Sequence, residues 1–140
     1  MTCAVTGSCL CGACQLNAEP GNHAGICHCQ MCRKWTGGNF IGVKSESPVT
    51  FNEEAPLGIY RSSEWGERVF CQACGSSLVW RTRDGQQQVV SIQVFDDPSR
   101  FPVVSEIFID RKPDGYNFAG THETMTEAEV MAQYAPKEEG

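Results

Sequence analysis

The chain of 140 residues has a mass of 15.4 kDa, which predicts a single domain over residues 1–140 with one core. Its 11 Lys and Arg residues are outnumbered by 17 Asp and Glu residues, and the net charge of −6 argues against a nucleic-acid partner. No apolar run approaches the ~18 residues of a membrane span, and the first residues lack an export signal, so we expect a cytoplasmic protein without a membrane partner.

Short strands separated by turn residues make up most of the predicted secondary structure. Four early segments are short, contain apolar or β-branched residues in several cases, and are bounded by Gly, Pro, Asn or Ser. They are residues 13–18, 26–29, 40–45 and 57–61.

The second half of the chain contains the clearest strand pattern. Residues 77–83 and 89–95 predict a hairpin, because Asp84-Gly85 between them supplies the positive φ angles of a two-residue turn. One more strand is predicted over residues 106–110.

Only the C-terminal end is predicted to be helical. Thr126 and Glu129 have the spacing of a capping box, Val130 and Met131 contribute to a partial apolar face, and Pro136 ends the run. The sequence has no internal repeat and no linker. It therefore predicts a mainly β fold of mostly antiparallel strands with a short C-terminal helix.

Cysteine is the unusual component, with nine residues. Because the number is odd, no export signal is present and the cytosol keeps thiols reduced, metal ligands are favoured over a disulfide framework. Cys14 is expected to be a small hydrophobic residue of the first strand, and Cys3 a thiol near the chain end. The others lie at ligand spacing and are Cys9, Cys11, Cys27, Cys29, Cys32, Cys71 and Cys74.

A CxC pair and a CxxC pair predict the two halves of one tetrathiolate zinc site. Tight turns can direct four sulfurs to a point about 2.3 Å from each, and the glycine after each pair permits such a turn and frees amides to donate to sulfur. The halves are 60 residues apart from Cys11 to Cys71, so a bound ion would contribute to folding. The alternative is four reduced core cysteines. The predicted ligands are Cys9, Cys11, Cys71 and Cys74.

Cys27, Cys29 and Cys32 predict a second zinc site that is also the catalytic centre. Three ligands leave the fourth position of a tetrahedral ion open. Three thiolates already neutralise Zn²⁺, which makes it a poor activator of water but leaves it soft enough to favour another sulfur. A thiol bound there would be deprotonated and nucleophilic at neutral pH, so the predicted substrate is a small thiol.

Residues near this second group are candidates for substrate binding. Arg33 and Lys34 could attract the carboxylates of an anionic thiol such as glutathione, although such a pair is also typical of solvated surface. Trp35, Tyr60 and Arg68 are further pocket candidates. Trp35 could instead pack over the metal loop, and Arg68 could hydrogen-bond the turn of the later CxxC pair.

Three alternatives to a catalytic second site remain open. His28 could be a fourth ligand and close the site, although in an extended segment its side chain should point away from those of Cys27 and Cys29. Cys29 and Cys32 could be a redox pair, which would require a helix N-terminus after a strand in a βαβ unit. The chain could also be a non-catalytic, zinc-stabilised module that binds a protein partner.

The three cysteine blocks together resemble the glutathione-dependent formaldehyde-activating family, which includes the centromere protein V domain. The matching segments are GSCLCGAC at 7–14, CHCQMCRKWTGG at 27–38, RVFCQACGSSL at 68–78 and, more weakly, VFDDPSRFPVVSEIFI at 94–109. The sequence departs from the family at Tyr116, where a Trp is common, and at Cys14, where an aliphatic residue is usual.

The resemblance implies a β-tent-like fold of stacked antiparallel sheets. It implies two zinc ions per chain: a structural one at the tetrathiolate site and a more labile one at Cys27, Cys29 and Cys32. The implied activity is the condensation of glutathione with formaldehyde to S-(hydroxymethyl)glutathione, which is a carbon–sulfur lyase reaction when written in reverse. The oligomeric state stays open.

Overall fold

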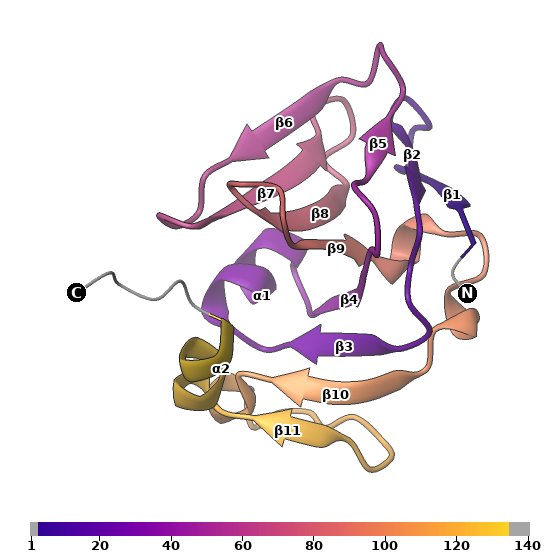
Figure 1. Ribbon diagram of the computed structural model, residues 1–140. Coiled ribbons are helices and arrows are strands. Elements are labelled where there is room, and N and C mark those ends of the chain that lie inside the picture. The colour runs from indigo at the N-terminus through magenta and orange to yellow at the C-terminus, as the bar shows by residue number, and fades with distance from the viewer. Residues whose placement is uncertain (1–2, 135–140) are drawn as a thin grey trace.

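The computed structural model describes residues 3–134, which form a mainly β fold with two sheets (Figure 1). The smaller sheet has the strand order β1-β2-β5 and the larger one the order β11-β10-β3-β4-β9-β8-β7-β6. The strands are β1 (Val5–Ser8), β2 (Gln15–Ala18), β3 (Ala24–Cys27), β4 (Phe40–Lys44), β5 (Thr50–Phe51), β6 (Leu57–Tyr60), β7 (Gly66–Cys71), β8 (Ser77–Thr82), β9 (Gln88–Ser91), β10 (Val103–Ile107) and β11 (Glu123–Met125).

Two helices accompany the sheets. Helix α1 (Gln30–Thr36) contacts β4, and helix α2 (Glu127–Tyr134) contacts β11. Neither is long and apolar enough to cross a membrane, and no other α-helix occurs in residues 3–134. Three 3₁₀ turns complete the elements: η1 (Ile92–Val94), η2 (Pro98–Arg100) and η3 (Ile109–Arg111).

The predicted mainly β class and C-terminal helix are confirmed. Helix α2 begins with the predicted capping box: the Thr126 amide donates to Glu129 Oε1 at 3.0 Å, and the Glu129 amide donates to Thr126 Oγ1 at 3.3 Å. Val130 is its buried residue. The predicted stop at Pro136 lies outside the described residues.

The predicted hairpin is present as β8 and β9, but its turn is longer than expected. The Thr82 amide donates to the Gln87 carbonyl, and only Gly85 of the loop has a positive φ, at 77°. Asp84 instead accepts hydrogen bonds from the Thr82 hydroxyl and the Gln86 amide, an arrangement typical of a wider polar loop. The predicted strand 89–95 also ends at Ser91 and continues as the turn η1.

Helix α1 was not predicted, so the expectation that only the chain end is helical is wrong. Its N-cap is Cys29, whose sulfur accepts a hydrogen bond from the Cys32 amide, and cysteine is not a usual capping residue. The sequence does contain a pattern typical of the end of this helix. Basic residues occupy its last turn, and Gly37 follows, which adopts a left-handed conformation.

Most strand pairs are antiparallel, as predicted, but at one end of the large sheet β10 is parallel to both β3 and β11. A buried carboxylate holds this region together. Glu106 on β10 lies 2.8 Å from His28 Nε2 and 2.8 Å from His122 Nδ1. Burial alone would raise the pKa of Glu106, but the hydrogen bonds with His122 and His28 hold it below its usual value.

We expect Glu106→Ala to lower the free energy of unfolding by about 2–3 kcal/mol, because the imidazoles of His28 and His122 lose their buried partner. The loss should be greatest near neutral pH and should shrink as pH falls through the lowered folded-state pKa, because an ionised Glu106 stabilises the fold. Denaturant titration measures it. Glu123→Ala, at an exposed position of β11, is the control, and an equal effect of both changes would contradict the prediction.

Candidate metal centres

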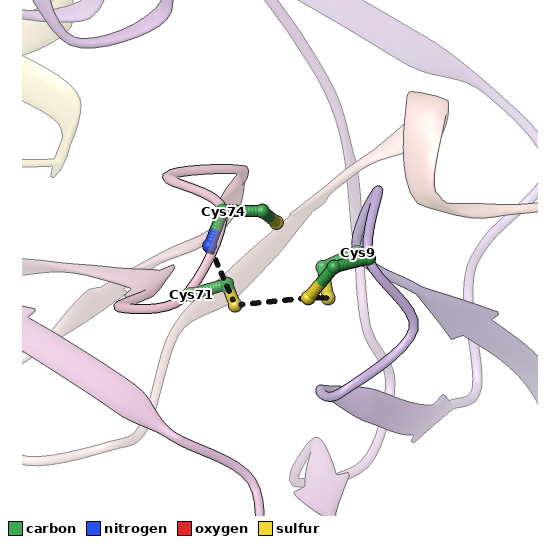
Figure 2. Close-up of side chains that lie close together, drawn as sticks. Cys9, Cys71 and Cys74 are labelled. Atoms are coloured by element: carbon green, nitrogen blue, oxygen red, sulfur yellow. Dashed lines mark hydrogen bonds between the residues drawn. The ribbon is translucent and has the colours of Figure 1, made fainter.

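The CxC and CxxC pairs meet in space although they are far apart in the sequence. Cys9 and Cys11 lie on the loop between β1 and β2, Cys71 ends β7, and Cys74 lies on the turn that leads to β8. The side chains of Cys9, Cys71 and Cys74 lie close together in Figure 2. The four ligand atoms lie within 4.8 Å of one another. Cys9 Sγ is 3.6 Å from Cys11 Sγ, which is 3.9 Å from Cys71 Sγ. Tetrahedral zinc with bonds of about 2.3 Å spaces its sulfurs about 3.8 Å apart, so this group fits zinc.

Both turns have the predicted glycine geometry. Gly12 has a φ of 81° and Gly75 a φ of 82°, which a side chain would strain. Backbone amides donate to sulfur as expected: the Cys14 amide lies 3.2 Å from Cys9 Sγ, and the Cys74 amide 3.4 Å from Cys71 Sγ. Such donors disperse the negative charge of thiolate ligands.

Ser76 joins the two halves and was not singled out from the sequence. Its hydroxyl accepts a hydrogen bond from the Leu10 amide at 3.0 Å and lies 3.1 Å from Cys74 Sγ. Hydrogen bonds from the Ser76 side chain and backbone lower the pKa of Cys74 to about 5.

Cys14 is buried and does not belong to the four-sulfur group. Its burial is the main cause that raises the pKa of its thiol to about 12. A thiol that stays protonated is in keeping with its predicted role as a small hydrophobic residue.

The second group, Cys27, Cys29 and Cys32, is brought together by the junction of β3 and α1. Cys27 ends β3, Cys29 caps the helix and Cys32 lies in its first turn, with the three sulfurs within 4.8 Å of one another. Cys29 and Cys32 are buried and Cys27 is half-buried. Together with Phe40 they form a hydrophobic cluster that is separate from the main core. The side chains that pack against this cluster are Trp35, Trp80, Val89 and Phe108.

One thiolate is favoured strongly within this group. Hydrogen bonds from the thiols of Cys27 and Cys32 and from the Cys32 amide, together with the charge of Arg68, lower the pKa of Cys29 to about 2 despite its burial. Hydrogen bonding to Cys29 and Cys32, then burial, raises the pKa of Cys27 above its ordinary value. Three sulfurs compete here for one dominant negative charge, so a divalent cation is needed to ionise all of them together.

His28 does not join the three sulfurs. Its side chain is fully buried, its Nε2 pairs with Glu106, and its ring lies 5.9 Å from that of Phe118. Among residues 3–134, no fourth Cys, His, Asp or Glu atom completes the group. The predicted orientation of His28 away from the cysteines agrees with this geometry.

The redox alternative meets one of its two structural requirements. Cys29 and Cys32 do lie at the N-terminus of a helix that follows a strand, although no helix was predicted there. The next strand, β4, is antiparallel to β3, so the unit is not βαβ. Both cysteines are free thiols in the structure.

The candidate substrate-binding residues lie in different environments. Arg33 is half-buried, and its Nε donates to the His28 carbonyl at 3.0 Å, while Lys34 is exposed on α1. Trp35 packs over the cysteine loop as its alternative role predicted, with its ring 5.3 Å from that of Phe40. Tyr60 is 64% exposed at the end of β6. A substrate contact of Arg33, Lys34 or Trp35 stays a prediction.

Arg68 contacts the second cysteine group, whereas a contact with the first group was expected. The suggested hydrogen bond to the turn of Cys71 is wrong: Arg68 Nη1 lies 3.4 Å from Cys32 Sγ. Its guanidinium carbon lies 5.0 Å from the centre of the Trp35 ring. The register of β7 with β8 was needed to find this contact, because 36 residues separate the two side chains in the sequence.

An open groove of about 710 Å³ is lined by Cys9 of the first cysteine group, but by no cysteine of the second. Its lining also includes Leu10 and Ser76, which lie close to the first group, and Gln93 and Val94 of η1. Trp35 and Phe40 contact the second cysteine group and also line the groove. Apart from these two aromatic residues, the lining near α1 is polar, with Thr36 and Asn39.

These features define a β protein with two cysteine groups that could hold metal ions. The chain belongs to the family of glutathione-dependent formaldehyde-activating enzymes, which it matches over residues 4–111. It is 33% identical over 129 residues to a Schizosaccharomyces pombe protein named an uncharacterized lyase, a match that covers 89% of this chain and 93% of that protein. A crystal structure of a Rhodobacter sphaeroides protein has the same fold, with a TM-score of 0.59 at 23% identity over 71% of this chain and 100% of that chain.

We expect Cys74→Ser to abolish the cooperative thermal transition of the zinc-loaded protein, because the binding energy of a tetrathiolate ion is coupled to folding. Cys32→Ser should remain folded, since the second group lies outside the main core. Cys3→Ser, at an exposed thiol, is the control for thiol loss. Calorimetry with zinc present measures the three transitions, and equal stability of Cys74→Ser and the unchanged chain would contradict the assignment.

Proposed function

We propose that this chain is a zinc-dependent, lyase-like enzyme that joins a small thiol to a small electrophile, or releases it, at Cys27, Cys29 and Cys32. The default reactants are glutathione and formaldehyde, which give S-(hydroxymethyl)glutathione. The observation that carries the proposal is the group of three sulfurs without a fourth ligand in the described chain. The name of the family and that of the fission yeast relative support a lyase-like reaction.

The residues of the second group have a direct chemical role in this proposal. Zinc held there would supply the positive charge that keeps an arriving thiol ionised. The half-buried Cys27 marks the more accessible side of the group, whereas Cys29 and Cys32 are buried. The aromatic side chains of Trp35 and Phe40 limit water at the sulfurs, and a drier site strengthens the attraction between charges.

The proposed reaction conserves atoms and electrons without a redox partner. The thiolate sulfur forms a bond to the aldehyde carbon, and the carbonyl π electrons move to the oxygen. That oxygen takes up the proton that the thiol released, which gives the hydroxymethyl thioether. In the reverse direction the carbon–sulfur bond breaks and the thiol is regenerated.

The groove offers a place for the rest of the thiol. Because Trp35 and Phe40 contact both the cysteines and the groove, a molecule with its sulfur at the second group can extend along this surface. Arg33 and Lys34 on α1 do not line the groove, so they are proposed as carboxylate contacts only for a substrate that reaches over the helix.

Metal content and thiol binding together test the proposed function. We expect about two zinc ions per chain in protein purified under reducing conditions, and about one in a variant with Cys27, Cys29 and Cys32 changed to Ser. This variant should remain folded, should lose glutathione binding measured by calorimetry, and should not accelerate adduct formation from ¹³C-formaldehyde followed by NMR. Cys3→Ser is the matched control.

A different outcome would favour the non-catalytic alternative. If the chain held one zinc ion, and the triple Ser variant kept both its fold and its thiol binding, the second group would not be the reactive site. The protein would then be interpreted as a zinc-stabilised binding module.

A further inference from the structure

Arg68 is a buried cation whose balancing charge is not a carboxylate. It is 3% exposed on β7, and charged side chains are rarely buried without a partner. The described residues form four salt bridges, and none includes Arg68. Its neighbour Glu67 is already paired with Arg81, at 2.8 Å. The anion that balances Arg68 must therefore be sought elsewhere.

The sulfurs of the second cysteine group are the acceptors that Arg68 reaches. Nη1 lies 3.4 Å from Cys32 Sγ, and the Trp35 ring covers the guanidinium at 5.0 Å. The Nε atom is buried and has no hydrogen-bond partner in residues 3–134. Nη1 of the guanidinium thus donates to a sulfur, while the N–H of Nε has no acceptor. A buried donor without an acceptor is expected where a further ligand completes the site.

We propose that Arg68 is a positioning residue that balances the charge of the second metal centre and so allows it to take an anionic sulfur as its fourth ligand. This inference rests on the proposed function. Three thiolates and a divalent cation carry one net negative charge, which Arg68 cancels. An arriving thiolate then meets a neutral site, whereas without Arg68 it would meet a negative one.

Arginine suits this position better than lysine. The planar guanidinium can stack on Trp35 and direct separate N–H groups toward Cys32 and toward a further acceptor. A lysine at residue 68 would keep the positive charge but lose the stacking and the fork of donors. Arg68→Met and Arg68→Lys therefore separate the effect of charge from that of geometry.

The test uses the full chain loaded with cobalt(II), whose absorption bands report the number of sulfur ligands. The second-site affinity for cobalt is measured by chelator competition, with the tetrathiolate site of the same chain as internal reference. We expect Arg68→Met to weaken second-site affinity by about tenfold or more and to leave the first site unchanged. Arg68→Lys should lie within about threefold of the unchanged chain.

The choice of fourth ligand provides a second readout. 2-Mercaptoethanol, which binds as a thiolate, and imidazole, which binds neutral, are titrated into each cobalt-loaded protein. Arg68→Met should lower the affinity for the thiol about tenfold more than that for imidazole. Arg81→Met, which removes an arginine of the same sheet that pairs with Glu67 and not with sulfur, should leave both affinities unchanged.

The outcomes distinguish this inference from the proposed function. If Arg68→Met matched the unchanged chain in second-site cobalt affinity, or lowered thiol and imidazole affinity equally, the role of Arg68 would be disproved while thiol binding stood. A different result is that neither the unchanged chain nor any variant binds the thiol, while Arg68→Met still loses cobalt from the second site alone. The proposed function would then fail and the charge-balancing role of Arg68 would hold. If Arg68→Met does not fold, Arg68→Lys decides, because it keeps the positive charge. Loss of cobalt from its second site alone would overturn the inference, and cobalt affinity close to that of the unchanged chain would support it.

Discussion

Electrostatic repulsion among crowded sulfurs has to be offset in this fold. Seven thiols lie in two groups, each with its sulfurs within 4.8 Å, and ionised sulfurs at that separation repel strongly unless positive charge lies among them. At the first group the fold supplies backbone amides, a serine hydroxyl and two glycine turns. At the second it supplies one capped helix turn and one guanidinium. Both arrangements favour thiolates around a divalent cation.

Strand β7 couples the two groups. It carries Arg68 to the second group and ends at Cys71 in the first, with a register irregularity between Val69 and Phe70. β8, which follows the Cys71–Cys74 turn, contributes Trp80 to the hydrophobic cluster around the second group. An ion that closes the first group therefore also fixes the strand that places the charge beside the second. The order of the first group and the position of Arg68 beside the second are therefore coupled through one strand.

The sequence was most informative where chemistry is local. The CxC and CxxC pairs, the run of Cys27, Cys29 and Cys32, and the capping box of α2 are each made by residues a few positions apart, and each was predicted. The meeting of the CxC and CxxC pairs was inferred from zinc chemistry, because 60 residues separate Cys11 from Cys71. The sequence was least informative where contacts depend on register. The parallel pairing of β10 with β3 and the contact of Arg68 with Cys32 join distant segments, and α1 is capped by a cysteine already assigned to metal. The Gly37 pattern was available and would have identified that helix.

A residue with an unfavourable backbone conformation also lies at the second group. Phe108 is the one residue other than glycine in residues 3–134 with a positive φ, at 55°, a conformation that costs about 1–2 kcal/mol for such a side chain. It turns the chain from β10 into η3 and packs its ring against the cysteine cluster. Strain of this kind persists where the surrounding structure requires it, and here Phe108 packs against the same cluster as Trp35 and Trp80. In such a partly buried cluster water screens charges weakly, so the charge of Arg68, 3.4 Å from Cys32 Sγ, acts on the sulfurs more strongly than it would at an exposed position.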